Sequence, residues 1–171
     1  MVTAGDILDV EVRAAAVFGL FCRAGEQEVL LLIPEISWVA SFCSCQQFAV
    51  PGDRLRVQVL HVDAERGQAS ASIKALHPDP WSSGRLAVGT VHQARVVRLI
   101  ESADRCGNGP GHLLELLPGA YVVLCGGLPL VCGQSCSVEV VASNFSNRAV
   151  RVALAERRNA EPTAPPDRSG E

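Results

Sequence analysis

Apolar and polar residues alternate in short runs through the first 75 residues, and this period of two is typical of half-buried β-strands. The runs are rich in β-branched residues and are separated by Gly, Pro and Asp. They predict strands at residues 7–15, 17–23, 28–34, 55–62 and 68–73. Residues 37–48 break the alternation, so we expect a loop with a short helix there. Five short strands with one long connection before the fourth predict a small Greek-key barrel.

The same pattern recurs in the second half of the chain. Residues 50–73 align without a gap with residues 131–154, at an offset of 81 positions. Residues 4–22 align with residues 88–106 at an offset of 84 positions. The second copy is therefore three residues shorter in the connection between the two blocks, where surface loops tolerate deletions. A repeat of this kind indicates a duplicated domain.

The repeat sets the predicted domain organisation, which is an all-β fold of two tandem five-stranded barrels. We expect a first domain over residues 1–76, a linker rich in Pro, Ser and Gly over 77–86, and a degenerate second domain over 87–155. Residues 156–171 contain three prolines and no apolar periodicity, and we expect them to form a disordered tail.

The first copy resembles the S1 RNA-binding domain family, whose fold is the OB-fold barrel. The resemblance rests on a set of short motifs whose order and spacing follow the family pattern across residues 4–81. These are GDILDVEV (5–12), FGLF (18–21), LLIPEISW (31–38), PGDRLRVQVLHVD (51–63), GQASASIKAL (67–76) and DPW (79–81). The second copy resembles the family only through its symmetry with the first. The resemblance implies S1-type barrels that bind single-stranded RNA.

The resemblance also implies an aromatic platform formed by Phe18 and Phe21. Residues three apart on a regular strand point to opposite faces, so a shared face requires a bulge or kink, which Gly19 permits. A base stacked on an aromatic ring contributes about 1–3 kcal/mol without reading sequence. The alternative is that one or both rings fill the barrel interior, as phenylalanines commonly do.

The family site contains three further groups, of which this chain keeps one. Asp63 matches the family aspartate, and its side chain is equally expected to stabilise the turn that follows it. Pro34 stands at or beside the family histidine, and Gln68 stands at the basic position. The candidates that supply positive charge instead are Arg66, Lys74, Arg54 and Arg56. The last two alternate along one strand, and either contact phosphate or form an ordinary solvated face.

Charge divides unequally between the two copies. The whole chain has a net charge of −3, with −3 over residues 1–75 and +2 over residues 84–155. Positions 102 and 105 of the second copy carry Ser and Arg where the first has its two phenylalanines, so the same platform is absent there. The second copy instead offers candidate phosphate contacts at Arg95, Arg98, Arg105, Arg148 and Arg151.

The motifs of other function classes are missing from the sequence. No nucleophile and base stand at motif spacing, and the close cysteine pair at 43 and 45 lacks a second pair at zinc-ligand spacing. The glycine-rich segment 105–112 lacks the Gly-Lys-Ser/Thr of a phosphate loop. We therefore predict no enzyme activity, no cofactor and no metal. The sequence contains no run of 18 apolar residues, so it predicts no membrane span. It has seven cysteines, an odd number, and shows no export signal, so we expect reduced thiols in the cytoplasm.

Two functions remain open from the sequence. The first is a non-catalytic protein that binds single-stranded RNA or mRNA through the aromatic platform, in translation or RNA metabolism. The alternative is a protein-interaction module associated with a ribosome or a ribonuclease, with weak or no RNA binding. Exposure of Phe18 and Phe21 would favour the first function, and burial of both would favour the second.

Overall fold

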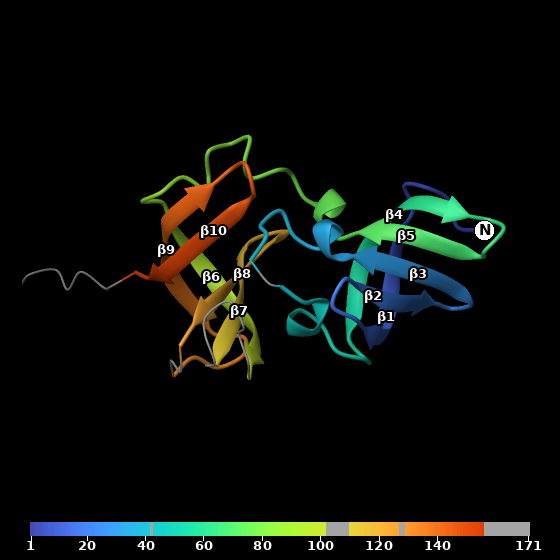
Figure 1. Ribbon diagram of the computed structural model, residues 1–171, viewed down its shortest axis with the longest axis horizontal. Helices are drawn as coiled ribbons and strands as arrows, with labels where there is room; N and C mark the ends of the chain where they lie inside the picture. The colour runs from blue at the N-terminus through green and yellow to red at the C-terminus, as the bar shows by residue number, and fades with distance from the viewer. Residues whose placement is uncertain (42, 102–109, 127–128, 156–171) are drawn as a thin grey trace, which may run out of the picture.

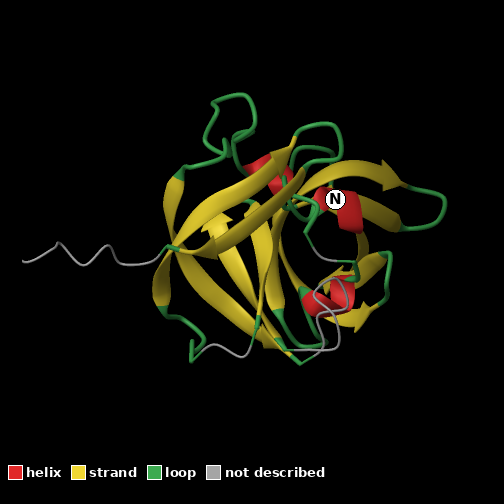
Figure 2. Cartoon of the chain, turned by 60° about the vertical axis from the view of Figure 1, so that its left-hand side comes forward, coloured by secondary structure: helices red, strands yellow, loops and turns green. Residues whose placement is uncertain are grey.

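The structure is a computed structural model that describes residues 1–41, 43–101, 110–126 and 129–155. The described chain consists of strands, with helix only as single 3-10 turns (Figures 1 and 2). The predicted tail over 156–171 lies outside the described residues, as does most of the glycine-rich segment 105–112. The all-β prediction is therefore confirmed for the part of the chain that the structure describes.

The first copy forms a closed five-stranded barrel in the strand order β1-β2-β3-β5-β4. The strands are β1 (Ile7–Ala15), β2 (Gly19–Ala24), β3 (Gln27–Leu32), β4 (Arg54–Asp63) and β5 (Gln68–Ser72). All neighbours are antiparallel except β3 and β5, whose parallel pairing closes the barrel. Alternate residues such as Val10, Val12, Leu20, Leu31 and Val57 fill its interior.

Two strands differ from their predicted bounds by two residues at one end, for local reasons. β2 begins at Gly19 because the Ala16 amide donates to the Gly19 carbonyl and turns the chain before it. β3 ends at Leu32 because a 3-10 turn with Pro34 inside it, η1 (Ile33–Glu35), follows directly. The predicted loop contains the expected short helix as a single turn, η2 (Cys45–Gln47).

The second copy repeats the order of the first, as β10-β9-β6-β7-β8. Its strands are β6 (Val91–Ile100), β7 (Gly111–Leu117), β8 (Ala120–Cys125), β9 (Ser135–Asn144) and β10 (Ala149–Leu154). One difference from the first barrel is that β8 and β10, the equivalents of β3 and β5, are not hydrogen-bonded to each other. The second sheet therefore curves like a barrel but has an open seam.

Residues 37–41 of the first copy, here called the seam segment, lie at this opening. Trp38 N donates to Gly119 O at 2.9 Å, and Ala40 N donates to Arg148 O at 2.9 Å. The side chain of Val39 is buried in the core of the second sheet. Figure 1 shows the loop after β3 passing between the barrels beside β8. The first copy thus supplies part of the packing of the second.

Further contacts hold the barrels together on the other side of the seam segment. Phe48 and Tyr121 meet edge to face with ring centroids 4.9 Å apart. Arg98 of β6 forms an ion pair with Asp53, just before β4. The linker is fixed by Trp81, whose indole N–H donates to the carbonyl of Trp38 at 2.7 Å. The Trp81 ring itself packs on the second copy, edge to face with Phe145 at 5.7 Å between ring centroids.

Candidate nucleic-acid interface

The rings of Phe18 and Phe21 lie side by side on the rim of the first barrel. Their centroids are 5.8 Å apart and their planes are nearly perpendicular. Phe18 is 54% exposed and Phe21 is 39% exposed. An edge-to-face pair of this kind leaves ring surface free for a further aromatic group.

The turn before β2 explains how both rings reach one side. Phe18 precedes the strand, so strand alternation does not apply to it. A Cβ atom on Gly19 would lie 3.0 Å from the carbonyl oxygen of Leu31, and only glycine fits this close approach without a shift. The sequence placed the kink at Gly19, and the structure turns the chain at that point.

The outer face of the barrel continues from Phe21 as a row of paired residues. Phe21 pairs with Leu30, Leu30 with Ser70, and Ser70 with His61. Residues in register on neighbouring strands point to the same face and are about 5 Å apart. His61 is exposed at the end of this row. His61 could not be identified as a site residue from the sequence, because only the register of β4 on β5 brings it into line with Phe21.

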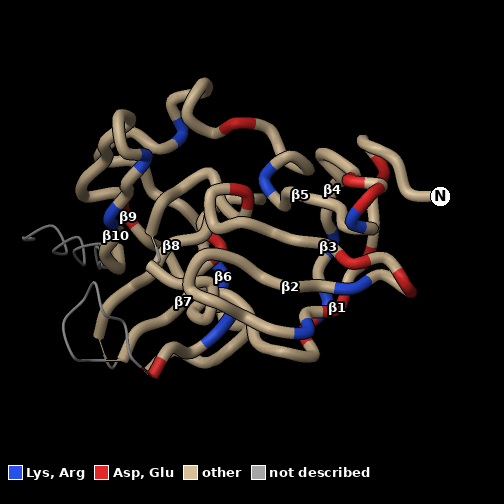
Figure 3. Tube along the Cα trace, turned by 45° about the vertical axis from the view of Figure 1, so that its right-hand side comes forward, with Lys and Arg blue, Asp and Glu red and all other residues tan. Residues whose placement is uncertain are grey.

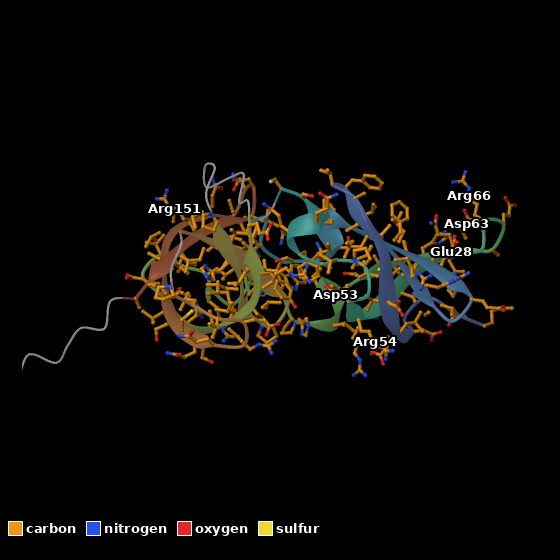
Figure 4. All side chains as sticks on the ribbon, turned by 90° about the horizontal axis from the view of Figure 1, so that it is seen from below. Glu28, Asp53, Arg54, Asp63, Arg66 and Arg151 are labelled. Atoms are coloured by element: carbon orange, nitrogen blue, oxygen red, sulfur yellow. The ribbon has the colours of Figure 1, made fainter. Side chains whose placement is uncertain are left out.

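A second row runs beside the first and ends at Asp63. Its members pair in register as Arg23, Glu28, Gln68 and Asp63. Asp63 accepts hydrogen bonds of 3.1 Å from the amides of Glu65 and Arg66, so its carboxylate stabilises the β4–β5 turn. Figure 4 shows Asp63, Arg66 and Glu28 together at the outer end of the first barrel.

A shallow pocket of about 240 Å³ joins Phe21 to this second row. Its wall includes Arg13, Arg23, Glu28 and Gln68. The two arginines flank Phe21 and were not among the candidates from the sequence. The side of the barrel that Arg13 faces could not be predicted from the sequence, because a β-bulge between Val12 and Ala14 interrupts the alternation of inward and outward residues along β1.

Charges on this barrel largely compensate one another. Arg54 pairs in register with Glu11, and Glu11 with Arg23, so opposite charges alternate across the strands (Figure 3). Arg56 donates to Asp9 at 3.1 Å, and this hydrogen bond lowers the pKa of the Asp9 carboxyl. Arg54 and Arg56 therefore have the surroundings of a solvated, charge-balanced face, and Figure 4 shows Arg54 on another side of the barrel from Asp63, Arg66 and Glu28.

The remaining basic candidates lie elsewhere. Lys74 belongs to the turn η3 (Lys74–Leu76), where its ammonium group stands over the ring of Trp38 at the junction of the barrels. Arg95 faces Glu115 at 3.9 Å, and Arg98 is engaged by Asp53. Of the other second-copy arginines, Arg148 lies at the junction and Arg151 is exposed on β10, while Arg105, like Ser102, lies outside the described residues.

The described chain shows no group of three or more His, Cys, Asp or Glu residues that could hold a metal ion. Nor does it contain a helix of the length and apolarity that a membrane span needs. Burial raises the pKa of the Cys22 and Cys45 thiols to about 11, which keeps them protonated at neutral pH. Cys125 is disulfide-bonded, so the expectation of reduced thiols throughout is wrong for this residue.

A family model and several curated relatives match parts of this chain. Residues 2–74 match the family model of the S1 RNA binding domain. A small ribosomal subunit protein bS1 homolog of Bacillus cereus is 31% identical over 117 residues, which are 67% of this chain and 28% of the relative. A 4-hydroxy-3-methylbut-2-enyl diphosphate reductase of Clostridium acetobutylicum is 31% identical over 99 residues, 57% of this chain and 15% of the reductase.

Among solved structures, GSP13 from Bacillus subtilis is 27% identical with a TM-score of 0.42, over 46% of this chain and 62% of GSP13. The chain spans less than a third of the length of the two curated relatives above. The matched residues coincide with the barrel that carries the aromatic pair. Residues 2–74 of this chain therefore match the S1 RNA binding domain family.

Proposed function

We propose that this chain is a non-catalytic protein that binds single-stranded RNA through the Phe18–Phe21 pair, in translation or RNA metabolism in the cytoplasm. The observation that carries the proposal is that both rings lie exposed and in contact on one rim of the barrel. Splayed bases of single-stranded RNA stack on rings held in this way.

The surroundings of the rings support the same ligand. The outer face of strands two and three and the loops beside them form the oligonucleotide surface of OB-fold proteins. Phe18 lies in the loop between β1 and β2, and Arg66 lies in the loop between β4 and β5. His61 and Ser70 add hydrogen-bonding groups along the row that begins at Phe21. The relatives named as ribosomal bS1 proteins support mRNA on the ribosome as the setting.

Stacking supplies most of the affinity in this proposal. Arg13 and Arg23 line the pocket beside Phe21, but Glu28 lies there too, and Arg66 is paired with Asp63 at 3.7 Å. A phosphate contact adds affinity that falls steeply with salt, in proportion to the number of phosphates neutralised. Because opposite charges nearly balance here, we expect a shallow salt dependence for binding at this face.

The protein-interaction alternative fits the structure less well. It predicts that both phenylalanines are buried, whereas both are exposed. Two features of the first copy favour that alternative, namely its net negative charge and the absence of a basic residue at position 68.

Fluorescence anisotropy of a labelled twelve-residue oligouridylate tests the proposal. We expect the double variant Phe18→Ala/Phe21→Ala to lose about 2 kcal/mol or more, which is about 30-fold in Kd. Ile7→Ala is the matched control, because it also removes an exposed apolar side chain from the first barrel. Circular dichroism verifies that each variant is folded. Equal binding by the wild type and the folded double variant would exclude the platform.

A further inference from the structure

A second candidate site lies where the two barrels meet. It is a pocket of about 370 Å³, here called the junction pocket, within the size range of small-ligand sites. The first copy contributes Pro34, Trp38 and Lys74, and the second contributes Asn147 and Arg148. None of the ten residues that line it is acidic, and two of them are cations. The pocket therefore has the charge of a site for an anion.

Its cations are held by aromatic rings rather than by carboxylates. The Lys74 ammonium lies 5.0 Å from the centroid of the Trp38 ring. The Arg148 guanidinium lies 5.8 Å from the same centroid and 5.5 Å from that of Phe145. Within the described chain, neither cation takes part in an ion pair. Both charges are thus fixed in place and left uncompensated.

Arg148 occupies a backbone position that favours glycine. The two copies align at an offset of 81 here, so Arg148 is the equivalent of Gly67 in the first hairpin. Gly67 has φ +65°, and Arg148 has φ +55°, which an L side chain adopts only with strain. Its Nη1 atom is also buried without a hydrogen-bond partner. The second hairpin therefore carries a strained, unsatisfied arginine where a glycine would relieve both defects.

The junction pocket adjoins the aromatic pair, because Ile33, which lines the pocket, is hydrogen-bonded to Phe18. Ile33 N donates to the carbonyl of Phe18 at 2.9 Å, and Ile33 and Pro34 line the pocket. Leu32, which precedes them, is an exposed apolar residue. An extended strand that leaves the rings along η1 would thus reach Lys74 and Arg148 directly.

We propose that the junction pocket binds a backbone phosphate of the single-stranded RNA whose bases stack on Phe18 and Phe21, so that one RNA contacts both barrels. This inference rests on the proposed function of the first barrel. The planar guanidinium of Arg148 presents paired donors to phosphate oxygens, and Lys74 adds a second positive charge. The seam segment and the hydrogen bond from Trp81 to Trp38 form the pocket before RNA binds.

Tryptophan fluorescence reports on this pocket separately from the aromatic platform. The chain has two tryptophans, Trp38 and Trp81, and both lie at the junction, whereas the platform contains only phenylalanines. We expect an oligouridylate of twelve nucleotides to change the tryptophan emission of the wild type. An oligouridylate of four nucleotides, long enough only for the Phe18–Phe21 platform, should bind without that change.

Arg148→Gly is the decisive variant, because glycine suits the turn and keeps its backbone hydrogen bonds. We expect it to melt at or above the wild-type temperature, to bind the twelve-residue RNA about tenfold more weakly, and to bind the four-residue RNA unchanged. Its salt slope for the longer RNA should be smaller by about one. Lys74→Gln tests the same pocket from the first barrel. Arg85→Ala, an exposed linker variant with the same charge change, should bind like the wild type.

The outcomes separate the two proposals. If Phe18→Ala/Phe21→Ala weakens binding but Arg148→Gly and Lys74→Gln match Arg85→Ala, the platform stands and the junction site is wrong. Equal weakening of short and long RNA by Arg148→Gly would also overturn a separate phosphate site. If the wild type binds neither RNA, both proposals fall.

Discussion

The Tyr121 amide of β8 donates a hydrogen bond of 2.9 Å to the Ser37 hydroxyl, although the two residues are 84 positions apart. Further along, Val123 N, two positions after Tyr121, donates to Oγ of Ser41, four positions after Ser37, at 2.7 Å. The seam segment thereby covers the edge of β8 that would otherwise offer unpaired amides to solvent. The second sheet therefore depends on the first copy for hydrogen-bond acceptors at β8, because its own β10 does not pair with β8.

Val39→Ala should therefore destabilise the second barrel more than the first, although Val39 belongs to the first copy. Its side chain is 1% exposed in the core of the second sheet. Removing two buried methyl groups costs about 2 kcal/mol. Urea unfolding measures the loss, and hydrogen exchange locates it in the amides of β8 and β10.

Val17→Ala is the matched control for this change, because Val17 is exposed in the first copy. It should leave both the unfolding midpoint and the exchange rates near their wild-type values. Faster exchange confined to β1–β5 in Val39→Ala would contradict the role of the seam segment.

The ion pair between Asp53 and Arg98 should show measurable coupling between the barrels. Their side chains are 34% and 23% exposed, and Arg98 Nη1 is buried without another partner. A double-mutant cycle with Asp53→Asn and Arg98→Met should give a coupling of about 1–2 kcal/mol, which diminishes at high salt. The exposed pair Asp9–Arg56 is the control and should show little coupling. Equal coupling energies in the two cycles would mean that the Asp53–Arg98 ion pair stabilises the junction no more than an exposed pair does.

The single tyrosine, Tyr121, makes the stability of the junction depend on pH. Burial raises the pKa of Tyr121 above its ordinary value of 10.0, and the neighbouring Glu115 carboxylate adds to the increase. The folded protein then holds this proton more tightly than the unfolded chain. The contribution to stability is complete below pH 10 and is lost as the pH rises above it.

Absorbance at 295 nm should therefore show ionisation of Tyr121 only above pH 10, together with loss of folded structure. Tyr121→Phe removes the hydrogen bond to Glu115, at a cost of about 1 kcal/mol near neutral pH. Its stability should fall less steeply than that of the wild type above pH 10. The comparison is needed because the buried Cys22 and Cys45 thiols also lose protons with a raised pKa of about 11. Ionisation of Tyr121 near pH 10 in the folded protein would show that its ring is accessible to water.

The strands could be predicted from the sequence because each buries one face, and the residue pattern records that burial locally. β1 has the predicted bounds, whereas β2 begins two residues late at Gly19 and β3 ends two residues early before the turn that contains Pro34. The open seam could not be predicted, because the groups that fill it come from residues 37–41 and show no periodicity. Similarly, the position of Lys74 over Trp38 depends on long-range packing rather than on spacing in the chain.

Gln68→Arg should strengthen RNA binding by restoring the basic group that the S1 family carries at this position. Gln68 lines the pocket beside Phe21 and pairs in register with Glu28 and Asp63, so an arginine there would be held by carboxylates while facing the RNA. One added phosphate contact should lower Kd about fivefold, which is about 1 kcal/mol, and increase the salt slope by about one. The matched control is Gln58→Arg on β4, which adds the same charge beside Ser72 and Ile7, away from the rings. If both variants strengthen binding equally, the gain is general attraction between charges, and the pocket beside Phe21 is not where the RNA backbone runs.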